Sequence, residues 1–169
     1  MREVYRPKSD FLMMVLHEEV PLTGGGLADA NLARLIELTS DSDDSNRDWA
    51  VTLLAGSGID TPEARSALRR AADDPHIDTR CEALVRLAVV EPSFALPRVK
   101  EMLEQDDIYA LSLEAAGLLA DPSLMPALEE INVALADDDD VAFGQLARDA
   151  LEASRTGQVP EALEWRLPD

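Results

Sequence analysis

The sequence is poor in the residue types that most catalytic and metal sites require. Its 169 residues include one cysteine, Cys81, and two histidines, His17 and His76. A single cysteine cannot form an internal disulfide, and the chain has neither a CxxC pair nor enough histidines for a multi-histidine zinc site. No nucleophile, acid or base stands in a catalytic pattern. We therefore expect a protein that is not an enzyme and that uses no metal or cofactor.

Long apolar runs are also scarce. Near the N-terminus the longest one, from Phe11 to Leu16, is too short for a signal peptide or a membrane span. We therefore expect a cytoplasmic protein with no membrane contact.

Basic residues are few compared with acidic ones. The chain has 15 lysines and arginines against 34 aspartates and glutamates, which gives a net charge of −19. A charge of this sign repels phosphate backbones and anionic headgroups, so we expect no direct binding to nucleic acid. It attracts a basic protein partner instead. The alternative is that the charge only keeps the protein soluble.

The signals of β-strands are missing. Aromatic residues make up 4% of the chain, and there is no alternating run of β-branched residues. Apolar residues recur instead at three- and four-residue spacing, which places them on one face of a helix. Thr61 before Pro62 and Ser123 after Pro122 are helix start signals, and Gly157 stands where a helix should end.

The helical pattern repeats along the chain. A shift of 33 residues, followed by two shifts of 32, superimposes four units that keep their apolar positions. Aligned alanines stand at positions 50, 83, 115 and 147, and leucines follow at 54, 87, 119 and 151. Each unit contains two helical segments and is predicted to form a helical hairpin. The sequence predicts an all-α fold, an α-solenoid of about four hairpins.

These units resemble HEAT repeats, specifically the short HEAT-like repeats first described in phycobilin lyases. The resemblance covers about residues 27–157 and rests partly on the segment Leu118–Leu128, with its Asp121, Pro122 and Pro126. It also rests on a six-residue spacing between an aspartate and an arginine in the first two units.

In that family, the aspartate and the arginine form a structural ladder between adjacent repeats. The resemblance implies this role for Asp41, Arg47, Asp74 and Arg80. Ser112 and Gly144 occupy the arginine position in the third and fourth units, so we expect the ladder to be broken there and the C-terminal half to be looser.

The two ends of the chain lie outside the repeats. Residues 1–26 are predicted to form a capping segment whose helix carries Phe11 and Val15 on one stripe. The alternative is a flexible basic arm. Residues 158–169 are predicted to form a C-terminal cap, and the alternative is a free tail that presents Trp165 to a partner.

The second helix of each hairpin lines the concave side of a HEAT stack, so its positions away from the core are our candidate protein-binding surface. These positions include Trp49, Thr52, Leu53, Glu82, Val85, Arg86, Glu114 and Asp149. Trp49 is suited to anchor an interface, although it is equally placed to pack under the N-terminal helix.

Aspartates cluster in the turn of every hairpin. They stand at positions 41, 43 and 44, at 73 and 74, at 106 and 107, and at 137 to 140. One per turn is expected to cap a helix. The surplus is predicted to form an acidic edge that meets a basic partner, or else only to be solvated.

Three functions are compatible with these patterns. The first is a non-enzymatic HEAT-repeat scaffold or adaptor that binds a protein through its concave face and acidic edge. The second is an immunity or antitoxin protein whose negative charge masks the basic site of a toxin. The third, implied by the family resemblance alone, is a bilin lyase or lyase subunit.

Overall fold

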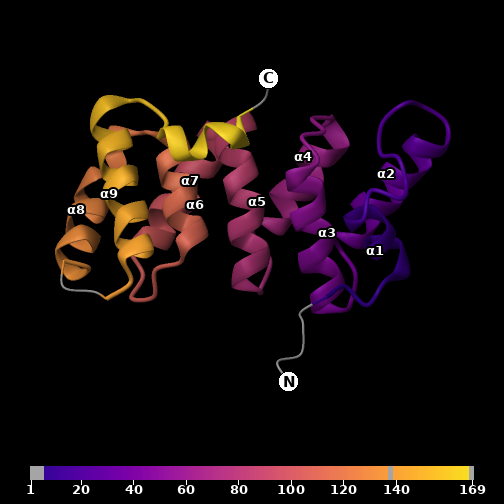
Figure 1. Ribbon diagram of the computed structural model, residues 1–169, viewed down its shortest axis with the longest axis horizontal. Helices are drawn as coiled ribbons and strands as arrows, with labels where there is room; N and C mark the ends of the chain where they lie inside the picture. Colours follow the sequence, from indigo (N-terminus) through magenta and orange to yellow (C-terminus); the bar gives the residue numbers. More distant parts are fainter. Residues whose placement is uncertain (1–5, 137–138, 168–169) are drawn as a thin grey trace. The chain divides into compact units, whose positions relative to one another are not determined.

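The computed structural model describes residues 6–136 and 139–167, and within these ranges the chain forms helices and no β-strand (Figure 1). A short helix, α1 (Asp10–Leu16), precedes four helical hairpins. The hairpins pair α2 (Leu27–Leu38) with α3 (Asp44–Gly56), α4 (Pro62–Ala71) with α5 (Ile77–Val90), α6 (Pro92–Leu103) with α7 (Ala110–Leu119), and α8 (Met125–Ala134) with α9 (Val141–Thr156). The predicted all-α fold of HEAT-like hairpins is confirmed.

Local chemistry sets the ends of several helices. The Thr61 hydroxyl accepts a hydrogen bond from the Ala64 amide at 3.2 Å, and Pro62 occupies the first helical position of α4. Gly157 ends α9 with a positive φ of 70°, a conformation that glycine adopts without strain. These predicted start and stop signals are confirmed.

The start of the fourth hairpin differs from the prediction. Asp121, and not Ser123, is the cap: its carboxylate accepts a hydrogen bond from the Ser123 amide at 2.8 Å. Hydrogen bonds from Ser123 hold the pKa of Asp121 below its usual value. A short 3₁₀ turn, η1 (Pro122–Leu124), follows and leads into α8. An aspartate before the proline and a serine after it are both good caps by composition, so the residue types alone do not separate them.

The chain divides into two compact units, Met1–Ala83 and Leu84–Asp169, and the division falls inside α5. Unit 1 contains α1 to α4 and the beginning of α5. Unit 2 contains the rest of α5, then α6 to α9 and a 3₁₀ segment, η2 (Glu161–Arg166). Each unit holds a core of leucines and alanines from consecutive hairpins.

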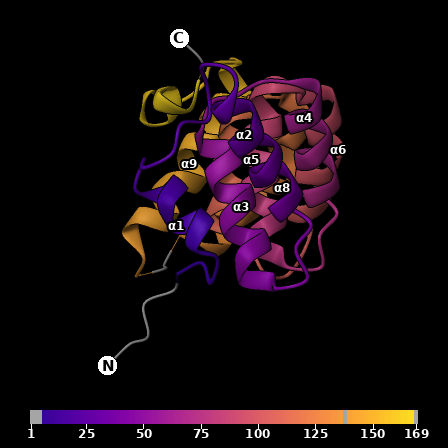
Figure 2. The ribbon, with the colours of Figure 1, turned by 90° about the vertical axis from the view of Figure 1, so that its right-hand side faces the viewer.

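In unit 1, the N-terminal helix packs on the second helix of the first hairpin. α1 lies beside α3, as Figure 2 shows, and buries Phe11, Leu12 and Val15. The guanidinium of Arg34 lies 4.4 Å from the centre of the Phe11 ring. Ahead of the helix, the amides of Lys8 and Ser9 both donate to the side-chain oxygen of Asn46, at 3.1 and 3.0 Å.

In unit 2, α7 and α9 pack closely against each other because small residues line their contact. The predicted core alanines, Ala115 on α7 and Ala147 on α9, are both fully buried, and so are Leu124 on η1 and Leu128 on α8. Close approach of helices through small side chains maximises packing contacts. The C-terminal η2 contacts α7.

Candidate functional site

The second helix of the first hairpin presents part of the predicted binding surface. Trp49, Thr52 and Leu53 are half-buried positions of α3, and their spacing of three and four residues places them on one face of the helix. Glu82, further along unit 1 on α5, is also half-buried. Their role in binding remains a prediction.

An ion pair joins the turns of the first two hairpins. Nε of Arg47 donates to Oδ2 of Asp74 at 2.9 Å and Nη2 donates to Oδ1 at 3.3 Å, while Nη1 donates to the carbonyl of Asp41 at 3.0 Å. The two side chains are 13% and 9% exposed. The ladder that the resemblance implied is confirmed for this pair. Arg80 instead donates to the carbonyls of Asp74 and Pro75, at 2.7 and 3.0 Å.

The environment of Asp74 explains its protonation state. Burial alone would raise the pKa of its carboxyl, but hydrogen bonds from Arg47 and from the His76 amide outweigh burial, so the pKa lies below its usual value. The bond to Asp74 likewise raises the pKa of Arg47. Both groups are therefore charged at neutral pH.

Two of the predicted binding residues in unit 2 are buried. Val85 and Arg86, on α5, are 2% and 7% exposed. Neither side chain offers an accessible surface. The neighbouring residues Leu84, Leu87 and Ala88 are buried as well.

The C-terminal segment covers the α7 part of the predicted surface. Nη2 of Arg166 donates to Oε2 of Glu114 at 2.6 Å, and both side chains are less than one-fifth exposed. A Cβ on Gly117 would lie 3.0 Å from Cδ1 of Leu163, so the glycine allows the segment to approach the helix closely. Sequence reasoning missed this contact, because it joins residues far apart in the chain.

The tip of the C-terminal segment is accessible. Trp165 is 71% exposed, and the guanidinium of Arg166 lies 4.3 Å from the centre of its ring. Leu163 is buried, whereas Leu167 is exposed. The segment η2 is a 3₁₀ helix, and Leu163 is its buried residue.

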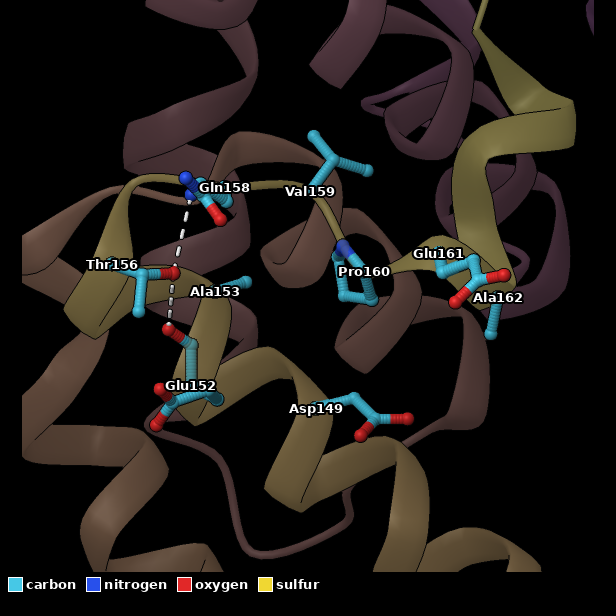
Figure 3. Close-up of a pocket in the computed structure, with 9 residues that line it drawn as sticks. All are labelled: Asp149, Glu152, Ala153, Thr156, Gln158, Val159, Pro160, Glu161 and Ala162. Carbon is cyan, nitrogen blue, oxygen red and sulfur yellow. Dashed lines mark hydrogen bonds between the residues drawn. The ribbon is translucent and has the colours of Figure 1, made fainter.

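Asp149 lines an open groove of about 730 Å³ between the end of α9 and the C-terminal segment (Figure 3). Glu152 and Thr156 lie on the α9 side, and Glu161 lies on the opposite side. Glu152 pairs with Arg155 at 2.9 Å, and Asp149 accepts a hydrogen bond from Gln145 at 2.7 Å. The groove is acidic, and its lining includes neither histidine nor cysteine.

A second groove, of about 560 Å³, lies in unit 2 near the turn that follows α6. Apolar side chains of α6, α8 and α9 line it together with three glutamates and aspartates. An acidic edge was predicted at these turns, but the apolar groove beside it was not. The signal in the sequence that could have indicated this groove is the position of the apolar residues Ile108 and Phe143 close to the aspartate clusters. Asp137 and Asp138 of the predicted edge lie outside the described residues.

The single thiol is unsuited to chemistry. Cys81 is buried in unit 1, and burial raises its pKa to about 12. Its thiolate fraction at neutral pH is therefore negligible. Among the residues that the structure describes, no three histidine, cysteine, aspartate or glutamate side chains gather to hold a metal ion. No helix in the described part of the chain is long and apolar enough to cross a membrane.

Comparisons with known proteins agree with the hairpin architecture. The model of the family described as HEAT repeats matches residues 32–120. Protein YibA of Escherichia coli strain K12 and its counterpart in strain O157:H7 are each 27% identical to the chain over 100 residues. These matches cover 59% of this chain and 36% of the relatives, so the chain spans only about a third of their length.

A solved structure supports the same fold. The X-ray structure of Escherichia coli YibA superimposes with a TM-score of 0.59 at 22% sequence identity, over 83% of this chain and 54% of that protein. At this level of identity, the likeness concerns the fold alone. The family match, which extends over more than half of the chain, establishes that this protein belongs to the HEAT-repeat family.

Proposed function

We propose that this chain is a non-enzymatic scaffold that binds a protein partner through the second helices of its hairpins. Repeat proteins of this type commonly use their extended surfaces to hold other macromolecules. The observation that carries the proposal is the state of α3, on which Trp49, Thr52 and Leu53 share one face and remain partly exposed. A tryptophan such as Trp49 is a typical interface anchor.

The charge of the chain favours a basic partner. A net charge of −19 accelerates the encounter with a positively charged surface and disfavours phosphate-rich ligands. The exposed aspartates at the hairpin turns, such as Asp44 and Asp73 in unit 1, add local attraction at the ends of the helices. We further propose that the protein acts in the cytoplasm.

Site-specific cross-linking tests the proposal directly. A photo-reactive amino acid would replace Thr52 on α3, and a matched variant would carry it at Ala33, an exposed position of α2. After irradiation in the native host, mass spectrometry should identify one protein that is cross-linked from position 52 and not from position 33. Equal cross-linking from both positions would contradict a binding role of α3.

The affinity of the purified partner then measures the contribution of the surface. We expect Thr52→Arg to weaken binding about tenfold in isothermal titration calorimetry, because a long cationic side chain on the same face as Trp49 would obstruct and repel a basic partner. Ala33→Arg adds the same charge away from α3 and should leave affinity within about twofold. Circular dichroism must show equal folding of both variants. Unchanged affinity of Thr52→Arg would rule out this surface.

The antitoxin function is the second candidate, and the net charge of −19 is the observation that favours it. A captured partner would then be a basic toxin, and one equivalent of this chain should abolish its activity in a cleavage assay. Raising the salt concentration should restore the activity, because screening weakens attraction between opposite charges. A partner that retains full activity in the complex would exclude this candidate.

A further inference from the structure

The groove near the turn after α6 combines an apolar floor with an acidic rim. Its floor is formed by Leu103, Ile108, Ile131, Leu135 and Phe143. Leu103 and Ile131 are buried, and the other three side chains are half-exposed. A volume of about 560 Å³ is typical of a site that receives a small ligand or a few side chains of a partner.

The rim carries negative charge that nothing in the described structure neutralises. Glu104, Asp106 and Glu130 are exposed, and none of them forms an ion pair or a side-chain hydrogen bond with another described residue. No residue that lines the groove is basic. Three uncompensated carboxylates around an apolar floor favour an occupant that is apolar at its centre and positive at its edges.

The bridging arginine of the first hairpin has no counterpart in the third hairpin. In unit 1, Arg47 joins the turn of its own hairpin to Asp74 in the turn of the next hairpin. In unit 2, Ser112 stands at the position equivalent to Arg47. The Ser112 hydroxyl is buried and donates to the carbonyl of Tyr109 at 2.7 Å, within its own turn. No arginine therefore bridges the third and fourth hairpins from this position.

We infer that the groove binds a segment of a protein partner that carries a leucine or phenylalanine flanked by lysine or arginine. The apolar side chain enters the floor, and the flanking cations pair with Glu104, Asp106 and Glu130. The inference rests on the proposed function in one respect, namely that the ligand is a protein. It adds a contact in unit 2 to the α3 surface of unit 1 and specifies the chemistry of the partner there.

Peptide titrations of the isotope-labelled full chain test the inference. The probe is a short helical peptide with one central leucine between arginines, and two controls replace the leucine with serine or the arginines with glutamine. In heteronuclear NMR spectra, the probe should shift the amides of Ile108, Leu135 and Phe143, and each control should bind at least about tenfold more weakly. Equal binding of the serine control would reduce the contact to unspecific charge attraction and overturn the inference. Equal binding of the glutamine control would overturn the role of the rim.

Charge reversal at neighbouring positions of α8 provides a matched pair of variants. Glu130 lines the groove, whereas Glu129 is exposed on the same helix and does not. Glu130→Lys should weaken the peptide about tenfold, and Glu129→Lys should change its affinity less than about twofold. Equal effects of the two variants would show that only the overall charge matters and would overturn the inference.

A steric pair distinguishes a peptide from a second copy of the chain. Ala134→Trp places a large side chain in the groove, and Val133→Trp places it at an exposed position that does not line the groove. Only Ala134→Trp should block the peptide. If the wild-type chain is a dimer in sedimentation analysis and Ala134→Trp makes it a monomer, the groove is a self-association surface and the inference is wrong.

The two proposals fail separately. A partner that binds Glu130→Lys normally but binds Thr52→Arg weakly would leave the proposed function intact and overturn the groove. A partner that is sensitive to Glu130→Lys and insensitive to Thr52→Arg would support the groove and reject the α3 surface.

Discussion

The turn between α4 and α5 and the turn between α6 and α7 hold equivalent positions in neighbouring hairpins, but they are secured differently. In the first turn, the amide of Asp74 donates to the carbonyl of Ala71. The amide of His76 donates to the Asp74 carboxylate, which also accepts a hydrogen bond from Arg47. In the second, the amides of Asp107 and Ile108 have no acceptor among the described residues. The first turn is thus tied to the preceding hairpin by Arg47, whereas the second lies open beside an apolar groove.

Removal of the ladder aspartate should have the largest effect. Asp74→Ala leaves Arg47 partly buried without its main partner, and we expect a loss of about 3 kcal/mol in the free energy of unfolding of unit 1. Asp44→Ala removes the other carboxylate near Arg47, 2.8 Å away but 73% exposed, and should cost at most about 0.5 kcal/mol. Urea denaturation measures both. Similar losses for the two variants would mean that the ladder does not stabilise unit 1.

Hydrogen exchange should sharpen the comparison between the turns. Because the Asp107 and Ile108 amides lack acceptors in the described structure, we expect them to exchange at least about tenfold faster than those of Asp74 and His76. In Asp74→Ala, the His76 amide should accelerate toward the rate of the second turn. Equal protection of both turns in the wild-type chain would contradict this description.

Loss of the ion pair on α7 should release the C-terminal segment. Arg166→Met removes the contact with Glu114, and we expect a loss of about 1 kcal/mol, measured as faster exchange of the Leu163 and Leu167 amides. Glu161→Gln, at an exposed position of the same segment, is the matched control. If the two variants exchange alike, the pair does not hold the segment on α7.

Relief of backbone strain in the third hairpin should give a gain. Ala120 ends α7 in the left-handed conformation, with φ of 47°, where glycine is favoured. We expect Ala120→Gly to stabilise unit 2 by about 0.5 kcal/mol, after allowance for the greater entropy of glycine in the unfolded chain. Exchange in the turn after α6 should stay fast. Slow exchange there would show that the strained helix end, and not the lack of acceptors within the turn, causes its fast exchange.

Acid should destabilise unit 1 as the carboxylate of Asp74 becomes protonated. The pKa of Asp74 is lower in the folded state, so its contribution is complete above the pKa of the unfolded chain and is lost as pH falls through the folded value. Asp74→Asn should flatten that part of the stability profile. A profile that is unchanged by this substitution would assign the acid sensitivity to other carboxylates.

The core could be predicted from the sequence because it is periodic. The four aligned alanines, including Ala50 and Ala147, are all fully buried, as the repeat register required. Periodicity also located the arginine of the ladder in the first hairpin and its absence from the third. These features depend on spacing within a repeat, which one chain displays directly.

The surface was harder to predict because it depends on segments outside the repeat. Glu114 lies at a position expected to face a partner, yet Arg166, which is 52 residues further on, occupies it. The burial of Val85 and Arg86 is equally invisible to spacing along a single helix. The groove beside Phe143 results from side chains on three helices, and no local pattern combines them.

The buried thiol has a practical consequence. Because Cys81 is the only cysteine of the chain and its thiol has a pKa of about 12, a thiol-specific reagent reacts only when α5 opens. The labelling rate of the unmodified protein therefore reports how often α5, the helix in which the two units divide, opens to solvent. No engineered cysteine is needed.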